Sequence, residues 1–177
     1  MSIVSPEKGW YSEPLDKEEK VWVAIALAWC LLTFFLMPVW HVVGKQNPSS
    51  ESYRVDPVKF NEIATAFTEK YKVGEENGIP IVHPPAGSDV FVVAGGYQWR
   101  PILELEKGKE YRIHLSSLDF QHGFSLVSPK FVMNYMVLPG YDYVIKVTPT
   151  EAGTYSIICN EFCGMGHHIM IGKLIVK

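Results

Sequence analysis

A continuous apolar run near the N-terminus is the first clear pattern in the chain. Residues 21–43 contain no formally charged side chain. As a helix they would extend roughly 35 Å, enough to cross the hydrocarbon layer of a bilayer. Trp22 and Trp40 lie near the two ends, where aromatic side chains meet the membrane interface. The pattern predicts one transmembrane helix, and Pro38 near its end is tolerated in membrane helices.

A cleaved signal peptide is the alternative for this run. A polar tail of mixed charge, residues 1–20, precedes it, the run is longer than a signal-peptide core, and no A-x-A cleavage pattern follows. We therefore expect a permanent anchor. Three lysines precede the run, against Lys45 and then Arg54 after it, so the positive-inside rule favours a cytoplasmic N-terminus. The rest of the chain is then expected outside the cytoplasm.

Residues 44–88 have the composition of a linker that contains one short amphipathic helix. Asp56 and Pro57 are residue types preferred at the N-cap and first position of a helix, and Gly74 is expected to end it. The apolar positions that follow the cap repeat at helical spacing: Phe60, Ile63, Phe67 and Tyr71. That face would pack on the domain core, on the membrane surface or on a partner subunit.

From residue 89 to residue 177 the pattern is that of β-strands. Short alternating or β-branched segments are separated by glycine- and proline-containing turns. The expected strands cover residues 90–94, 110–115, 124–127, 141–147, 154–158 and 173–176. Short strands at this spacing predict a mainly β fold, a sandwich or barrel.

Length and charge narrow the picture. The chain has 177 residues and a net charge of −3, which suits one domain with an appended anchor. After residue 50 there are 12 basic and 14 acidic residues. This near balance predicts partner contacts that depend little on long-range charge steering. We expect no nucleic-acid partner.

The candidate chemistry lies close to the C-terminus. Two thiols, an imidazole and a thioether fall within twelve residues, at Cys159, Cys163, His167 and Met170, and His122 lies upstream. Soft sulfur donors combined with imidazole select copper. Two cysteines supply enough thiolate to bridge two metal ions, whereas a one-copper blue site needs one. The pattern predicts a dinuclear copper centre that carries electrons.

Three other interpretations use the same residues. Cys159 and Cys163 could form a disulfide in an oxidising compartment, but this would leave the nearby imidazole and thioether without a role. The C-x3-C-x3-H spacing could hold zinc, with His168 or His122 as the fourth ligand. A membrane-tethered copper carrier or assembly factor could use the same donors. Cys30 lies inside the apolar run and is expected to act as a small hydrophobe.

The run C-x-E-x-C-G-x-G-H-x-x-M, residues 159–170, resembles the dicopper A loop of cytochrome c oxidase subunit II. The resemblance extends to residues 96–99, 119–124 and 138–140, and to the preceding anchor. It implies a cupredoxin-like Greek-key sandwich or barrel with one N-terminal transmembrane helix. Most members have two membrane helices, so the single anchor is similar to the B-type, or ba3-type, branch.

The resemblance also implies a role for each matching residue. Cys159 and Cys163 would bridge two coppers, and His122 and His167 would each terminate one. Met170 and the backbone carbonyl of Glu161 would be weak ligands. The Glu161 side chain matches a position that reaches a magnesium ion at the boundary with subunit I. Trp99 matches an aromatic residue at the surface where electrons enter; the family's longer aromatic cluster is replaced here by Arg100 and Pro101. A position in the sandwich core is the alternative for Trp99.

The implied function is electron transfer within a respiratory complex. The donor would be a c-type cytochrome or a small blue-copper protein. The acceptor would be haem in subunit I, which reduces oxygen to water, with small accessory subunits alongside. The chain would be a single-pass protein of the cell membrane with its copper domain on the extracytoplasmic, periplasmic side. A related nitric oxide reductase is the alternative, because the copper loop does not reveal the final acceptor.

Overall fold

The computed structural model describes residues 8–43, 50–128 and 132–177. The chain divides into two compact units, one around the N-terminal helix and one that begins at residue 48. Parts of the predicted polar tail and linker, residues 1–7 and 44–49, lie outside the described residues.

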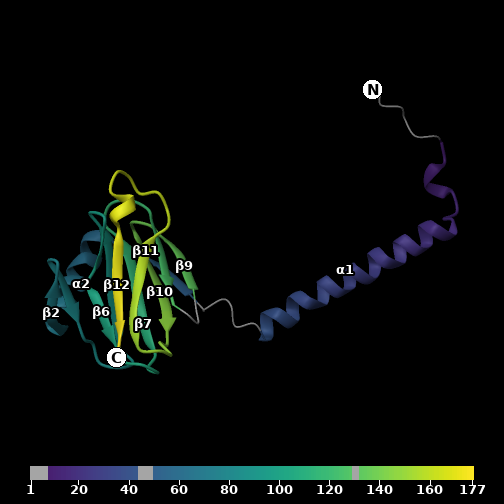
Figure 1. The fold of residues 1–177 in the computed structure, drawn as a ribbon. Coiled ribbons are helices and arrows are strands. Elements are labelled where there is room, and N and C mark those ends of the chain that lie inside the picture. Colours follow the sequence, from purple (N-terminus) through teal and green to yellow (C-terminus); the bar gives the residue numbers. More distant parts are fainter. Residues whose placement is uncertain (1–7, 44–49, 129–131) are drawn as a thin grey trace. The chain divides into compact units, whose positions relative to one another are not determined.

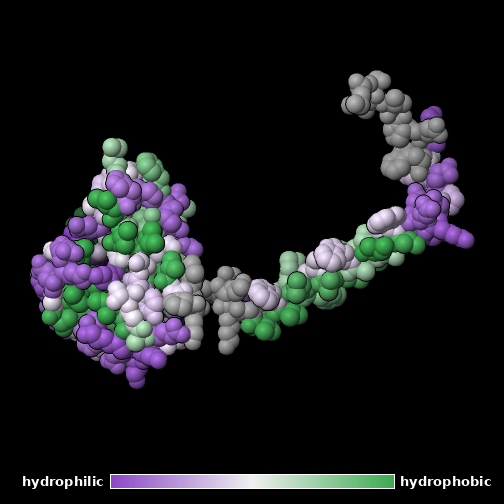
Figure 2. All heavy atoms as spheres, in the orientation of Figure 1, coloured by the Kyte–Doolittle hydropathy of each residue, from purple (hydrophilic) through white to green (hydrophobic). Residues whose placement is uncertain are grey.

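The N-terminal unit is dominated by helix α1 (Lys17–Val43), after a short 3-10 turn η1 (Trp10–Ser12). The helix begins with a reciprocal cap: the Asp16 backbone N–H donates to Glu19, and the Glu19 N–H donates to the Asp16 carboxylate at 2.7 Å. This cap explains why α1 starts four residues before the predicted apolar run. Every side chain of α1 is exposed, and apolar residues line it (Figure 2). Its length and composition suit a membrane span.

The second unit is a sandwich of two β-sheets (Figure 1). One sheet has the order β1-β10-β7-β4-β5, formed by β1 (Ser50–Arg54), β10 (Tyr141–Val147), β7 (Tyr111–Ser117), β4 (Asp89–Gly95) and β5 (Gln98–Arg100). The other has the order β2-β3-β6-β12-β11-β8-β9, formed by β2 (Lys72–Glu76), β3 (Ile79–Val82), β6 (Ile102–Leu105), β12 (Ile171–Val176), β11 (Gly153–Cys159), β8 (His122–Val127) and β9 (Val132–Val137).

The core lies between these sheets and follows the two-residue alternation of their strands. Tyr111, Ile113 and Leu115 of β7 are buried, while Arg112 and His114 between them are only partly covered. The same alternation buries Ile157 and Cys159 of β11. The predicted mainly β sandwich with one N-terminal apolar helix is therefore confirmed.

Helix α2 (Pro57–Tyr71) covers part of the first sheet. The Asp56 carboxylate caps it, accepting hydrogen bonds from the backbone N–H groups of residues 58 and 59 at 2.9 and 3.0 Å. Phe60 and Phe67 are buried and pack edge-on against Phe91 of β4. Of the three surfaces considered for this face, the structure shows packing on the domain itself. The helix ends at Tyr71, before the predicted stop at Gly74.

The structure differs from the predicted linker over residues 44–88. Strands β1, β2 and β3 lie in this region and belong to the two sheets. Strands β1 and β2 form outer edges of their sheets, so their outer backbone and many of their side chains face solvent. An edge strand therefore needs little of the apolar alternation that identifies a buried strand. The polar sequence of β1, Ser-Glu-Ser-Tyr-Arg, shows this directly.

Candidate metal centre

The candidate ligands lie on two adjacent strands and the loop that follows one of them. His122 is the first residue of β8, and Cys159 is the last residue of β11; these two strands pair antiparallel. Residues 160–170 connect β11 to β12, and the Cys159 N–H donates to the Met170 carbonyl at 3.1 Å to close the loop. The strands therefore fix both ends of the ligand loop beside His122.

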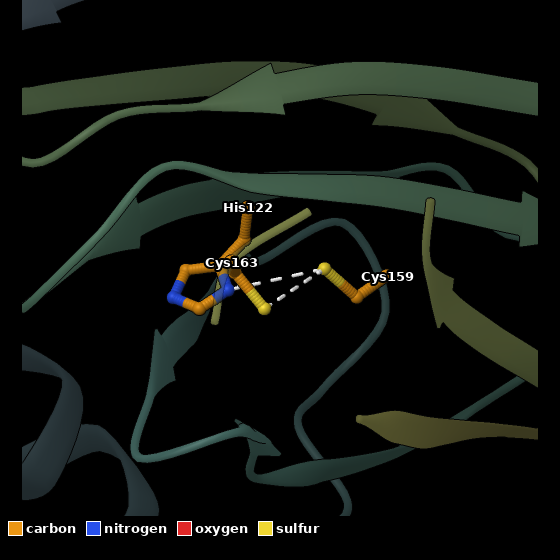
Figure 3. A group of neighbouring side chains, drawn as sticks. All are labelled: His122, Cys159 and Cys163. Carbon is orange, nitrogen blue, oxygen red and sulfur yellow. Dashed lines mark hydrogen bonds between the residues drawn. The ribbon is translucent and has the colours of Figure 1, made fainter. Parts of the chain in front are cut away.

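The two thiols and the upstream histidine form one buried cluster (Figure 3). The Sγ atoms of Cys159 and Cys163 lie 3.7 Å apart, and Cys159 Sγ lies 3.9 Å from His122 Nδ1. One ligand atom from each of the three residues falls within 4.8 Å of the others. A disulfide has an S–S distance near 2 Å, so the predicted alternative of a bridge is not what this structure contains.

The remaining predicted ligands adjoin the same cluster. His167 lies in the short 3-10 turn η2 (His167–Ile169), with Nδ1 3.7 Å from Cys163 Sγ. Met170 is fully buried, and its Sδ lies 3.9 Å from Cys163 Sγ. The Glu161 carbonyl oxygen lies 3.2 Å from Cys159 Sγ. This set of two thiols, two imidazoles, a thioether and a carbonyl fits the soft-donor chemistry of copper.

Asp119 orients His122 and was not singled out by the sequence analysis. Its carboxylate lies 2.8 Å from His122 Nε2, which leaves Nδ1 directed at the thiols. The same carboxylate accepts hydrogen bonds from the N–H groups of Gly96 and Phe120. Burial raises the Asp119 pKa, but these hydrogen bonds outweigh burial, and the net pKa is below its usual value. The Asp-x-x-His spacing of residues 119–122 is the sequence feature that could have identified Asp119 as a partner of His122.

The pKa of the Cys163 thiol is raised to about 11. Burial contributes most, followed by the hydrogen bond to Cys159 and the charge of that neighbour. The free thiol is therefore protonated at neutral pH. A metal ion binds the thiolate, so metal binding must release this proton and becomes more favourable as pH rises.

The structure places Trp99 in the sandwich core, the location considered beside its electron-entry role. The residue is 1% exposed, and a role in electron entry stays a prediction. The ring packs edge-on against Phe124 and His122, with centroid separations of 5.3 and 6.1 Å. The strand alternation of β5 turns Trp99 inward. Gly172 of β12 leaves room for it, because a Cβ added to Gly172 would come within 2.6 Å of the Trp99 Cβ.

The exposed surface at the loop is formed by other residues. Phe162 is 78% exposed, and its ring centroid lies 5.9 Å from that of His167. Met165, Ile169 and Phe120 are exposed as well. His168, considered as a zinc ligand, is exposed, and the cluster of potential ligands found among the described residues does not include it.

Comparison with known proteins agrees with this geometry. No family model matches the chain. The chain is similar to cytochrome c oxidase subunit 2 of Thermus thermophilus, with 31% identity over 165 residues that cover 90% of this chain and 91% of that relative. Its fold is similar to a chain of a haem-copper terminal oxidase dimer (TM-score 0.56, 22% identity, covering 91% and 100% of the two chains). It is also similar to a variant of the cupredoxin rusticyanin (TM-score 0.50, 20% identity, covering 74% and 99%).

These findings give the fold and the family together. The rusticyanin likeness shows that the sandwich is cupredoxin-like, as predicted. The oxidase relatives and the exposed apolar helix α1 indicate a membrane protein that works in complex with a catalytic subunit. The extent of identity to the Thermus thermophilus relative shows that this chain belongs to the cytochrome c oxidase subunit 2 family, the electron-accepting subunits of a membrane oxidoreductase.

Proposed function

We propose that the chain holds a dinuclear copper A centre and relays single electrons to the catalytic subunit. The ligands would be His122, Cys159, Cys163, His167, Met170 and the backbone carbonyl of Glu161. One observation carries this proposal: each thiol has its own imidazole. Cys159 Sγ lies 3.9 Å from Nδ1 of His122, and Cys163 Sγ lies 3.7 Å from Nδ1 of His167. Two equivalent sulfur–imidazole pairs, 3.7 Å apart at sulfur, suit two metal ions better than one.

Copper bound at this site would supply reversible one-electron chemistry. The protein residues keep the site rigid and dry. Cys159, Cys163 and Met170 are buried, and the first is held by a strand hydrogen bond. Asp119 fixes the tautomer and direction of the His122 ring. A copper carrier would need ligands open to exchange, and the burial of these sulfurs favours a permanent centre over a carrier.

The full-length chain in detergent provides the direct test. We expect copper loading to give two coppers per chain and a mixed-valence electron paramagnetic resonance signal, with hyperfine structure shared between two copper nuclei. A single-copper blue spectrum, or retention of zinc in preference to copper, would contradict the dinuclear assignment.

We infer that the electron donor is a c-type cytochrome or small blue-copper protein that docks on the exposed apolar residues of the ligand loop. Phe162, Met165 and Ile169 project there, and Phe162 contacts the ring of His167. Such a docking site would bring the donor next to the proposed ligand His167, and Trp99 would not need to lie at the surface. The acceptor is haem in subunit I, where oxygen is reduced to water, and small accessory subunits complete the complex.

This docking mode predicts a weak salt dependence. After residue 50 the chain carries nearly balanced charge, so long-range electrostatic steering contributes little to association. We expect the second-order rate constant for donor oxidation by the intact oxidase to fall less than about threefold between roughly 50 and 500 mM salt. Salt screens charge–charge attraction between the partners, and that attraction is already small here. Stopped-flow spectroscopy of the donor measures this. A loss of about a hundredfold would instead indicate a charge-steered interface.

One candidate membrane helix in the described residues favours the B-type branch. We place the protein in the cell membrane with residues 48–177 on the extracytoplasmic side, as the lysine distribution favours. A magnesium ion at the boundary with subunit I, held through the Glu161 side chain, stays a prediction, since its other ligands would come from that subunit.

A further inference from the structure

We propose that the turn between β4 and β5, residues Gly96 and Tyr97, is a brace that locks the ligand loop against His122, with Tyr97 as its positioning residue. The inference rests on the proposed copper function, and it assigns a role to a side chain that is not itself a ligand. Two independent contacts carry it, one made by the Tyr97 ring and one by the Gly96 backbone.

The backbone of this turn is unusual at Tyr97. Gly95 pairs with Gln98, so Gly96 and Tyr97 are the two central residues of a hairpin turn, with φ angles of 58° and 60°. Glycine adopts such angles readily, but a bulky aromatic residue rarely does. A residue held in this region persists where the surrounding structure determines its conformation, and such residues gather at functional sites. The position of the Tyr97 side chain is therefore maintained at a cost in backbone conformational energy.

The Tyr97 ring lies directly against the backbone of the ligand loop. A Cβ added to Gly166 would lie 2.4 Å from Cγ of Tyr97, and one added to Gly164 would lie 2.8 Å from its hydroxyl oxygen. In the sequence, both glycines lie between the proposed ligands Cys163 and His167. The loop therefore has glycine at both positions that the Tyr97 ring covers. A larger residue at either position would force the loop away from the ring.

The same turn holds the other half of the site through its backbone. The Gly96 N–H donates to Asp119 Oδ2 at 2.8 Å, and Asp119 Oδ1 lies 2.8 Å from His122 Nε2. One two-residue turn therefore contacts the loop that carries Cys163 and His167 and, through Asp119, the ring of His122. Fixing both halves from one point keeps the separation of the two sulfur–imidazole pairs constant, as fast electron transfer requires.

Replacing Tyr97 by glycine tests the brace, because glycine keeps the turn conformation and removes the ring. In the full-length chain we expect copper loss to a chelator to become at least about tenfold faster, in line with the roughly 10- to 100-fold loss of metal affinity when groups that orient ligands are removed. The mixed-valence hyperfine pattern should broaden. Tyr97→Phe keeps the ring and should restore both properties to near wild type. If Tyr97→Gly retains copper and signal as the wild type does, the brace is excluded.

A matched control lies in the turn between β2 and β3. Asn77 is also a non-glycine residue with positive φ, at 52°, and Gly78 follows it. Asn77→Gly therefore makes the same kind of backbone change away from the metal centre. It should leave copper release and the hyperfine pattern unchanged. Equal effects of the two glycine substitutions would mean that chain flexibility, and not the Tyr97 ring, controls the site.

Gly166→Ala tests the same contact from the side of the loop and leaves Tyr97 in place, so it is informative even if Tyr97→Gly folds poorly. Gly166→Ala has a permitted backbone conformation, but its methyl group would collide with the Tyr97 ring. Alone it should speed copper loss by about tenfold or more. Tyr97→Gly and Gly166→Ala disrupt the same contact between the ring and the loop, so the double variant should lose copper about as fast as Tyr97→Gly alone. Effects of the two substitutions that simply multiply would overturn the inference.

Failure of the brace and failure of the copper proposal are distinguishable. If the wild-type chain binds fewer than two coppers or lacks the mixed-valence signal, the proposed function fails. If the wild type shows both and the Tyr97 variants match it, only the brace fails.

Discussion

Replacing Cys159 by serine is expected to abolish the mixed-valence copper signal and reduce copper binding from two ions per chain to one or none. The Cys159 sulfur lies 3.9 Å from His122 Nδ1 and 3.7 Å from Cys163 Sγ, so it adjoins both sulfur–imidazole pairs. A serine hydroxyl is a hard and poorly ionised donor that does not replace a thiolate on copper. Metal analysis and electron paramagnetic resonance of the full-length chain measure the loss. Cys163→Ser should behave in the same way.

Two controls separate ligand loss from general damage. Cys30→Ser removes the third free cysteine, which lies in α1, and should leave both copper content and spectrum unchanged. Met170→Leu keeps a buried side chain of similar size but removes the thioether 3.9 Å from Cys163 Sγ. Because this ligand is expected to be weak, the variant should shift the reduction potential and retain much of the spectrum. A Cys159→Ser chain that still bound two coppers with a shared signal would refute the bridging role.

The proximity of the candidate ligands could be predicted from the sequence because its constraints are local, and their role as ligands stays a prediction. Cys159, Cys163, His167 and Met170 lie in one short loop, and their spacing alone indicates a shared site. His122 was also identified, because an isolated histidine before a strand could meet that loop. The structure brings all of them together without requiring a residue outside the predicted set.

The supporting residues were harder to predict because their roles depend on tertiary contacts. Tyr97 and Gly96 are about 70 residues from the ligand loop along the chain, and nothing in their local sequence reveals that contact. For Trp99 the sequence left a surface role and a core position open, and the strand alternation of β5 turns it inward. The edge strand β1 was missed because polar residues suffice at an edge. Local sequence pattern therefore predicts the candidate metal ligands better than it predicts the residues that support them.

Replacing Gly123 by alanine is expected to destabilise the sandwich and the metal centre together. Gly123 follows His122 on β8, and its carbonyl accepts a hydrogen bond from the Asn160 N–H at 3.2 Å. An added Cβ would lie 2.1 Å from Asn160 Oδ1 and 2.7 Å from the backbone nitrogen of Glu161. The second contact is with backbone, which cannot rotate away. Overpacking of this kind typically costs about 1–3 kcal/mol.

Denaturant unfolding of the metal-free chain followed by near-ultraviolet circular dichroism measures this cost, and copper release measures the effect on the site. Gly74→Ala is the matched control, because the nearest atom to its added Cβ is Ile81 Cδ1 at 3.9 Å, an ordinary contact distance. It should change the free energy of unfolding by less than about 0.5 kcal/mol. Since Gly123 lies on the strand that carries His122 and packs against the start of the ligand loop, Gly123→Ala should accelerate copper release as well as unfolding. Equal behaviour of the two alanine variants would show that β8 and the loop can separate freely, and the rigid site described above would then lack its structural basis.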